Sequence, residues 1–324
     1  MKVPARALRS ISMEHPHNIP ILILHRMRHL FALLALLIGC QTTQASPVWE
    51  AKENELVALL GDTFWERDYH GAAIETALTV ATAGKKVRFR NLGWSGDTPR
   101  CESRSYFGPP REGFDRLKQQ LAEIKPTTVM ICYGAVDSFT GEAGLASFLQ
   151  AYREMLQMIR ETTQANIVLF SPPPASRDTK RWPSLAAQSA QREMYARAIE
   201  KLATEEKLAF ADLHALMKDQ AWSTVNGVTF TQQDYKQIAP LVVRSLGLSI
   251  DPATLAQPSL RETIISKNQL FFQRWRPQNE IYLFGSRKHE QGNNGVEIPQ
   301  FDPLIAKKEA LIFGSFANPN TPDQ

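Results

Sequence analysis

Cysteine is scarce in this sequence of 324 residues. Its three cysteines are too few for the disulfide framework that holds small secreted domains together. Glycine and proline, with 17 and 20 residues, are too rare for a fibrous or low-complexity protein. Hydrophobic residues make up 43% of the chain and charged residues 22%, which argues against a disordered chain and is typical of a globular protein.

The sequence also lacks the excess of basic residues that nucleic-acid binding requires. Its net charge is +4, but five of the 37 basic residues and only one of the 33 acidic residues lie in residues 1–46. Residues 47–324 therefore carry 32 charges of each sign, which balance to zero. Because contacts to phosphates need clustered positive charge, we exclude nucleic acid as a partner.

No hydrophobic run is long enough to span a bilayer, which takes about 20 residues. The run LFALLALLIG covers only residues 30–39, and Arg26 and Arg28 precede it. A basic flank followed by a short apolar core is typical of a secretory signal. We therefore expect residues 1–46 to be a leader and the protein to be exported.

Two processing sites are possible after this leader. Leu37-Ile38-Gly39-Cys40 resembles the lipobox of bacterial lipoproteins, in which the cysteine is lipidated after cleavage. Cleavage after Ala45 is the alternative, because Thr43-Gln44-Ala45 fits an ordinary signal-peptide site. The protein is accordingly predicted to be periplasmic, or anchored to the membrane through a lipidated Cys40.

Short apolar runs alternate with longer amphipathic segments from residue 55 onward. The predicted strands are residues 56–60, 87–91, 128–133, 167–170 and 209–213. The predicted helices are residues 71–83, 114–124, 143–162, 185–206 and 231–246. Because the strands are apolar throughout, we expect a parallel sheet that is covered by helices on both faces. This α/β domain would occupy residues 48–249.

The C-terminal part of the chain, residues 250–316, has a different pattern. It is rich in aromatic residues but has few long periodic runs, and its aromatic residues are Phe271, Phe272, Trp275, Tyr282, Phe284, Phe301, Phe313 and Phe316. We expect an irregular arm that packs its aromatic side chains on the sheet domain. Residues 317–324 are predicted to be a frayed tail.

Small polar motifs follow three of the predicted strands. They are Gly61-Asp62-Thr63, Gly93-Trp94-Ser95-Gly96 and Gly134-Ala135-Val136-Asp137, and Asn226-Gly227-Val228-Thr229 comes later in the chain. Ligands of parallel α/β sheets bind beyond the carboxyl ends of the strands. The motifs therefore predict one site at this edge of the sheet.

These four motifs, in this order, resemble the conserved blocks of the SGNH (GDSL) hydrolases over about residues 55–247. The resemblance implies a three-layer α/β/α, flavodoxin-like fold with a five-stranded parallel sheet. It also implies hydrolysis of esters of lipids, acylated sugars or other carbohydrates. The arm from Lys267 to Pro303 is similar to the C-terminal extension of a bacterial subgroup of these proteins.

The resemblance also assigns roles to residues of this chain. Thr63 stands where the family has its nucleophilic serine, Val136 where it has an oxyanion-hole asparagine, and Thr229 where it has its histidine base. The positions that keep the family residue, and that would shape the binding site, are Gly61, Asp62, Gly93, Gly96, Gly134, Asp137 and Asn226. Gly93 or Gly96 would supply a backbone N–H to the oxyanion hole.

These departures weaken the expected chemistry. The methyl group of Thr63 restricts rotation about χ1, and it crowds the carbonyl that the hydroxyl would have to attack. Loss of one oxyanion donor costs a factor of about 10²–10³ in rate, and base catalysis contributes about 10²–10⁴. We therefore expect a degenerate esterase that binds a small-molecule or carbohydrate ester ligand, or a partner, with little or no hydrolysis.

Two alternatives remain open. The chain could be an active ester hydrolase in which Thr63 is the nucleophile and His289 or His214 is a relocated base. Otherwise the arm could be the functional part, with the sheet domain as a scaffold for assembly. His70, the remaining histidine after the leader, is expected at the surface.

No histidine pair has metal-ligand spacing, and the glycine spacing of a dinucleotide loop is absent, so neither a metal nor a cofactor is predicted.

Overall fold

The computed structural model describes residues 49–106, 108–176, 183–226, 229–251 and 257–317. The predicted leader, with Cys40 and Ala45, and all but the first residue of the predicted tail lie outside the described residues. Contacts divide the chain into residues 1–45 and residues 46–324, and the second unit is described below. Within its described part, no helix is long and apolar enough to cross a membrane.

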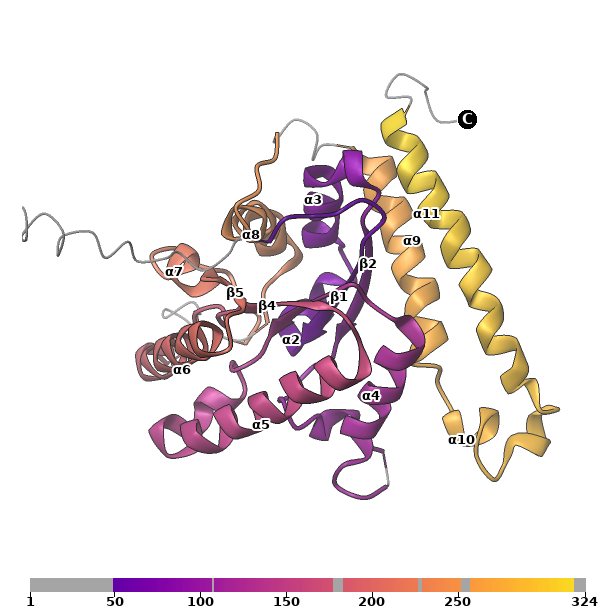
Figure 1. The fold of residues 1–324 in the computed structure, drawn as a ribbon, viewed down its shortest axis with the longest axis horizontal. Helices are drawn as coiled ribbons and strands as arrows, with labels where there is room; N and C mark the ends of the chain where they lie inside the picture. Colours follow the sequence, from indigo (N-terminus) through magenta and orange to yellow (C-terminus); the bar gives the residue numbers. More distant parts are fainter. Residues whose placement is uncertain (1–48, 107, 177–182, 227–228, 252–256, 318–324) are drawn as a thin grey trace, which may run out of the picture. The chain divides into compact units, whose positions relative to one another are not determined.

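Five parallel strands form the central sheet, as the sequence predicted (Figure 1). The strands are β1 (Leu56–Gly61), β2 (Arg88–Gly93), β3 (Thr128–Cys132), β4 (Asn166–Phe170) and β5 (Ala209–Ala211). Their order is β2-β1-β3-β4-β5, so the chain changes direction across the sheet between β1 and β3. Gly61 pairs with Gly93 on one side and with Cys132 on the other, so three strand ends lie level. Such a switch point is where α/β sheets bind ligands.

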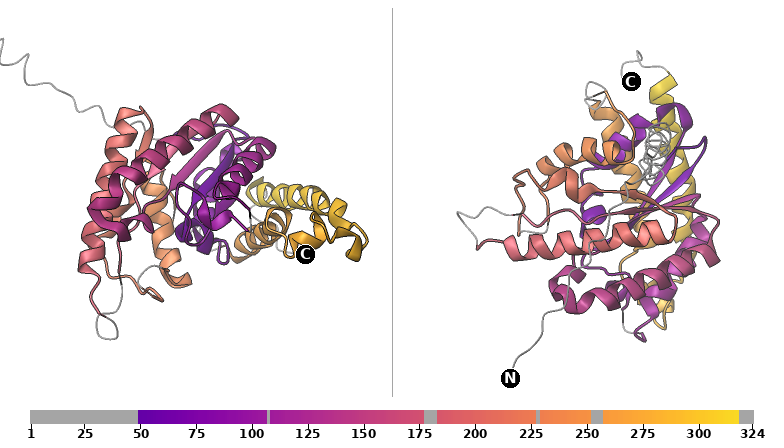
Figure 2. Two further views of the ribbon diagram at one scale, coloured as in Figure 1. Left: turned by 90° about the horizontal axis from the view of Figure 1, so that it is seen from below. Right: turned by 60° about the vertical axis from the view of Figure 1, so that its left-hand side comes forward.

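Helices cover both faces of this sheet, which confirms the three-layer α/β/α prediction (Figure 2). One layer contains α3 (Ala73–Ala81), α7 (Leu213–Met217) and α8 (Gln232–Ser245), and the other contains α4 (Glu112–Ile124), α5 (Gly141–Thr162) and α6 (Ala186–Glu205). Along β1, Val57 and Leu59 face the first layer, whereas Ala58 and Leu60 face the second. Both faces of the sheet are therefore buried, as its uniformly apolar strands indicated.

The C-terminal arm is helical, which corrects the expectation of an irregular segment. Helices α9 (Pro258–Trp275) and α11 (Phe301–Ala317) pack against each other, and α9 runs beside the edge strand β2 (Figure 1). They are linked through α10 (Glu280–Leu283) and the 3₁₀ turns η5 (Lys288–Gln291) and η6 (Asn294–Gln300). The periodicity of α9 was hard to recognise because its buried face includes Lys267 and Asn268.

A buried ion pair joins the arm to the sheet domain. The Lys267 ammonium, 1% exposed, pairs with the carboxylate of Glu75 in α3 and donates to the backbone oxygen of Phe89 at 2.9 Å. Asn268 donates to the other Glu75 oxygen at 2.8 Å. Because Glu75 is itself buried, it depends on the arm for its counter-charge. The sheet domain and the arm therefore share one folded structure.

Candidate active site

Thr63 lies at the end of β1, as the first residue of the short helix α2 (Thr63–Asp68). The Asp62 carboxylate accepts a hydrogen bond from the Phe64 N–H at 3.0 Å and caps this helix. A Cβ at Gly61 would lie 2.3 Å from the backbone oxygen of Cys132, so only glycine permits this approach of β1 to β3. The first motif thus presents the Thr63 hydroxyl at the carboxyl edge of the sheet. Helix α2, at six residues, was too short to predict from periodicity.

The second motif contacts Thr63 directly. Gly96, in the left-handed region with φ +73°, donates its backbone N–H to Thr63 Oγ1 at 3.1 Å. The Gly93 N–H is instead bonded to Asn91 Oδ1 at 2.9 Å. Of the two glycines proposed as oxyanion donors, Gly96 is therefore the one that faces Thr63. Its N–H bonds the hydroxyl itself.

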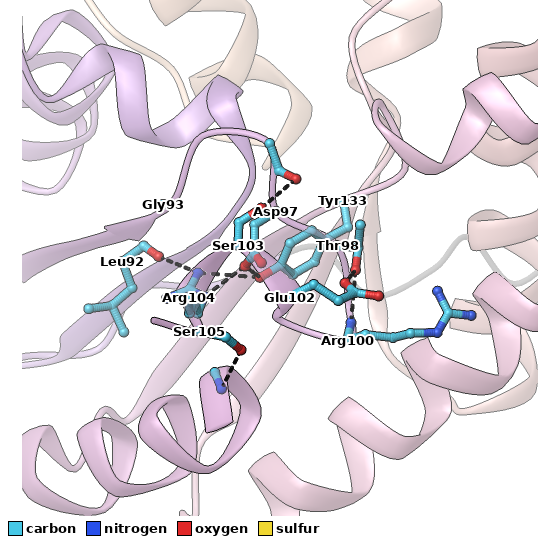
Figure 3. A network of polar contacts seen from close by, with 12 residues as sticks. Leu92, Gly93, Asp97, Thr98, Arg100, Glu102, Ser103, Arg104, Ser105 and Tyr133 are labelled. Atoms are coloured by element: carbon cyan, nitrogen blue, oxygen red, sulfur yellow. Dashed lines mark hydrogen bonds and ion pairs between the residues drawn. The ribbon is translucent and has the colours of Figure 1, made fainter. Parts of the chain in front are cut away.

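A buried network supports the loop that carries Gly96 (Figure 3). Arg104, 3% exposed, donates to Asp97 Oδ2 at 2.7 Å and to the backbone oxygen of Leu92 at 2.8 Å. The Tyr133 hydroxyl donates to the same Asp97 oxygen at 2.9 Å. Burial raises the pKa of Asp97, and the Arg104 cation opposes that rise. The network ties the end of β2 to the end of β3 and so fixes the loop between them.

The C-terminal arm also reaches this loop, through Arg276. Its guanidinium carbon lies 3.7 Å from the centroid of the Trp94 ring, and its Nη1 lies 3.4 Å from the Gly93 oxygen. The same guanidinium is 3.8 Å from a carboxylate oxygen of Glu66, which accepts a hydrogen bond from Ser95 Oγ at 2.6 Å. The second motif is therefore held from the arm side as well as from the sheet side.

The third motif follows β3 and brings Val136 to the site. Val136 lines the cavity beside Thr63, and its side chain carries no hydrogen-bond donor. Gly134 accepts the first hydrogen bond of the following turn, from the Ser138 N–H at 3.0 Å. Burial raises the pKa of Asp137 to about 7, and Arg100 lies 3.9 Å from one of its oxygens. The Asp137 carboxyl group is therefore partly protonated at neutral pH.

The fourth motif places Thr229 near the site without bringing it into the cavity. Asn226 Oδ1 accepts a hydrogen bond from the Thr229 N–H at 2.8 Å, while residues 227–228 lie outside the described residues. The next residue, Phe230, lines the cavity at Thr63. The side chain at position 229 is half-buried and carries no imidazole.

None of the three histidines of the described segments lines this cavity. His214, at the start of α7, is buried with Nδ1 3.2 Å from the Pro172 oxygen, and burial lowers its pKa. His289 is exposed in η5 of the arm. His70 is exposed and stacks on the neighbouring Tyr69, with ring centroids 4.7 Å apart. Among the described residues, the Thr63 hydroxyl is hydrogen-bonded by the Gly96 N–H and by no histidine.

The cavity beside Thr63 is small and contains a cation that the sequence analysis missed. Its volume is about 10 Å³, enough for about one water molecule. Its lining consists of Asp62, Thr63, Phe64, Ala135, Val136, Pro173, Arg192 and Phe230. Arg192 of α6 is 1% exposed and donates Nη1 to the Pro173 oxygen at 3.1 Å. Its Nε and Nη2 have no partner in the described structure.

Arg192 and Asp62 give this cavity an unusual charge state. Burial raises the pKa of Asp62 to about 6, against the opposing effect of the Arg192 cation. Burial lowers the pKa of Arg192 to about 10, so the guanidinium stays charged at neutral pH. Asp62 Oδ2 is buried without a hydrogen-bond partner among the described residues. Two opposite charges with unsatisfied atoms therefore line a space the size of one water molecule.

The described segments contain no group of three or more histidine, cysteine, aspartate or glutamate residues placed to hold a metal ion. Cys101 and Cys132 are both free and buried. The arrangement thus offers a hydroxyl, one backbone donor, a carboxylate and a guanidinium.

Comparison with known proteins agrees with this architecture. The model of the GDSL-like lipase/acylhydrolase family matches residues 59–230. No curated protein sequence matches this chain. Among solved structures, the chain is similar to BT4096, described as a gut microbial diltiazem-metabolizing enzyme, with a TM-score of 0.50 and 16% identity. The match covers 63% of this chain and 49% of BT4096, so the chain corresponds to about half of that protein's length.

The chain is also similar, at lower TM-scores, to two further solved structures. The acetylxylan esterase Axe2 from Geobacillus stearothermophilus matches with a TM-score of 0.48 and 16% identity, over 63% of this chain and 100% of that one. A lipase/acylhydrolase from Enterococcus faecalis matches with a TM-score of 0.44 and 20% identity, over 61% and 98%. The family match spans more than half of the 324 residues, and with it we conclude that this chain belongs to the GDSL-like lipase/acylhydrolase family.

Proposed function

We propose that this protein is an exported member of the family that binds a small-molecule or carbohydrate ester ligand, or a partner, with little or no hydrolysis. The observation that carries the proposal is the lining of the cavity at Thr63, which contains no imidazole among the described residues. A hydroxyl without a base is a weak nucleophile at neutral pH. The changes at Thr63, Val136 and Thr229 thus remove the groups that would move a proton and stabilise an oxyanion.

Two further features support this proposal. The Gly96 N–H, the expected oxyanion donor, is already bonded to Thr63 Oγ1. The cavity volume of about 10 Å³ leaves no room for an acyl group without movement of its walls. Both features make attack on an ester carbonyl less favourable.

Hydrolysis of 4-nitrophenyl acetate tests the proposal. The purified protein would be compared with Thr63→Ala and with a buffer blank between pH 5 and 9. We expect the wild-type rate to match that of Thr63→Ala at every pH. A wild-type rate at least about 100-fold above Thr63→Ala, the size of a base-catalysed step, would overturn the proposal. His214→Ala and His289→Ala would then show whether either histidine is the relocated base.

A second candidate function rests on Asp62 and Arg192. Asp62 has a pKa of about 6 and an unpaired oxygen, so it could accept the Thr63 proton near neutral pH. Arg192 offers two unpaired donor nitrogens, Nε and Nη2, that could stabilise an oxyanion in place of the lost asparagine. An esterase of this kind would lose activity in Asp62→Asn and as the pH falls below about 6. Activity that survives in His214→Ala and His289→Ala but is lost in Asp62→Asn would separate it from a hydrolase that uses histidine.

Export is part of the proposal, and its support is the sequence of residues 1–46 alone. Periplasmic release after Ala45 and membrane anchoring through a lipidated Cys40 predict different products. Expression in a bacterium with labelled palmitate would label the protein only if Cys40 is lipidated. A Cys40→Ala variant is the matched control, and an unlabelled, released wild type would favour cleavage after Ala45.

A further inference from the structure

A second and much larger cavity lies between the sheet domain and the C-terminal arm. Its volume is about 620 Å³, within the range of about 300–1,000 Å³ that is usual for small-ligand sites. Helix α4 and Trp94 form one wall, and the end of α9, α10 and η6 form the other. Figure 1 shows α10 beside α4. The family match ends at residue 230, so the arm wall lies outside it.

Aromatic side chains from both parts line this cavity. Trp94 comes from the loop after β2, Trp275 from the end of α9, and Phe284 from the segment after α10. The Phe284 side chain is 55% exposed. Arg276 stacks on Trp94 and fixes the position of its ring. Arg274 stacks on Trp275 in the same way, with its guanidinium carbon 4.3 Å from the ring centroid, so both tryptophan rings are held in place before a ligand arrives.

The arginines of the cavity are neutralised by carboxylates of the protein. Arg104 donates to Asp97 at 2.7 Å, and Arg116 donates to Glu280 at 2.8 Å. Arg274 lies 3.6 Å from Glu123 and donates to Asp302 at 3.2 Å. No cation of the described lining is left for an anionic ligand, because each already has an acidic partner. The charge pattern thus favours a neutral ligand.

Uncharged polar groups complete the lining. Gln119 and Gln120 of α4 face the cavity, and the side chain of Gln120 makes no hydrogen bond to any described residue. A primary amide both donates and accepts, which suits hydroxyl groups. Flat apolar surfaces beside amides fit a sugar ring, since its C–H face packs on an aromatic ring while its hydroxyls need polar partners.

We propose that this cavity binds a neutral oligosaccharide through Trp275, Phe284 and Gln120. The inference rests on the binding part of the proposed function and moves the ligand away from Thr63. It does not depend on whether Thr63 is catalytic. A positive hydrolysis assay would overturn the proposed lack of chemistry and leave this binding site standing.

Isothermal titration calorimetry with the full chain tests this inference. The probes are xylohexaose, cellohexaose, chitohexaose and mannohexaose as neutral chains, and hexagalacturonate as an anionic one. We expect at least one neutral hexasaccharide to bind and to change the tryptophan fluorescence, and hexagalacturonate to bind more weakly. Failure of all four neutral probes, or preference for hexagalacturonate, would overturn the inference.

Substitutions of residues that line the cavity test whether the oligosaccharide binds there. Phe284→Ala and Gln120→Ala should each weaken binding roughly tenfold, because each removes one contact to the sugar. Phe139→Ala is the matched control, because Phe139 is 53% exposed and does not line the cavity. The control should bind like the wild type. Unchanged binding in both cavity variants would assign the oligosaccharide to another surface and overturn the inference.

Discussion

The cavity at Thr63 and the cavity beside the arm differ in how their charged side chains are paired. The small cavity at Thr63 holds Asp62 and Arg192 with unsatisfied atoms on both side chains, in a space of about 10 Å³. The large cavity, of about 620 Å³, is lined by arginines that the protein neutralises itself, such as the Arg116–Glu280 pair. A buried polar group without a hydrogen-bond partner costs free energy of folding, whereas arginines that are paired with carboxylates leave a cavity lining suited to a neutral ligand.

The comparison separates two ways in which a binding surface can change. At Thr63, Gly61 allows the close approach of β1 to β3 and Gly96 has a φ of +73°, and we propose that this backbone carries replaced reactive side chains. At the large cavity the wall is new, because the arm supplies Trp275 and Phe284. We infer that ligand binding in this chain depends on the arm, whereas the edge of the sheet at Thr63 has lost most or all of its chemistry.

The largest effect is expected at the junction of the two parts. Lys267→Met should lower the free energy of unfolding by about 3–5 kcal/mol, because Glu75 would remain buried without its counter-charge. Urea denaturation followed by far-UV circular dichroism measures this. Lys201→Met is the control, since Lys201 is 80% exposed and lies 3.9 Å from Glu205.

A second variant distinguishes charge from packing at that junction. Lys267→Met combined with Glu75→Leu should recover most of the lost stability, since a buried ion pair can be replaced by apolar residues at little cost. A loss below about 1 kcal/mol in the single variant, the range of a surface pair, would show that the arm is not electrostatically coupled to α3.

The buried Asp62 at the small cavity should make the stability of the protein depend on pH. Between about pH 4 and 6 the folded protein keeps the Asp62 proton, whereas the unfolded chain, with a pKa near 3.8, releases it. Raising the pH through this window therefore destabilises the wild type relative to Asp62→Asn. A pKa of about 6 instead of 3.8 corresponds to about 3 kcal/mol. Parallel unfolding curves at pH 4 and pH 7 measure the difference, and a constant gap would contradict the assigned pKa.

Restoring the family side chains should bring chemistry back to the small cavity. Thr63→Ser, Val136→Asn and Thr229→His together should raise hydrolysis of 4-nitrophenyl acetate roughly 100-fold above wild type, the lower end of base catalysis. The control carries the second and third changes with Thr63→Ala and should stay at background. An inactive triple variant would mean that the small cavity or Arg192 also blocks catalysis.

The smallest effect concerns the neutrality of the large cavity. Glu123→Gln removes one of the two carboxylates near Arg274 and should improve hexagalacturonate binding about threefold, the value of a partly exposed pair. The gain should vanish at high salt because of screening. Glu161→Gln, an exposed change on α5, is the control. No gain at low salt would show that Glu123 does not set the charge of the site.

The sequence predicted the sheet domain better than the features that distinguish this protein. The strands were recognisable as short runs that are apolar throughout, and the helices between them by their helical periodicity. Thr63, Val136 and Thr229 were predicted as site positions because each lies in a motif that resembles a family block, and their roles stay predictions. Arg192 and Lys267 were missed for one physical reason, since each is a charged residue on the buried face of a helix.

The spacing of Arg192 and Lys267 from nearby apolar residues does indicate that both lie on buried helix faces. Arg192 precedes Tyr195 by three residues and Ile199 by seven, which places it on their face of α6. Lys267 stands three residues after Ile264 and four before Phe271 in the same way. No local pattern could name their partners, because Glu75 and Asp62 are distant in sequence.

Trp94 and Gly96 belong to one short loop, yet the first lines the large cavity and the second bonds Thr63. Arg276 of the arm contacts that loop by stacking on Trp94 and donating to the Gly93 oxygen. A substitution in this loop would therefore affect both the edge of the sheet at Thr63 and the proposed sugar site, so we expect the two to constrain each other's variation. Relatives that lose the arm would be free to vary this loop, whereas relatives that keep it would inherit the loop almost unchanged.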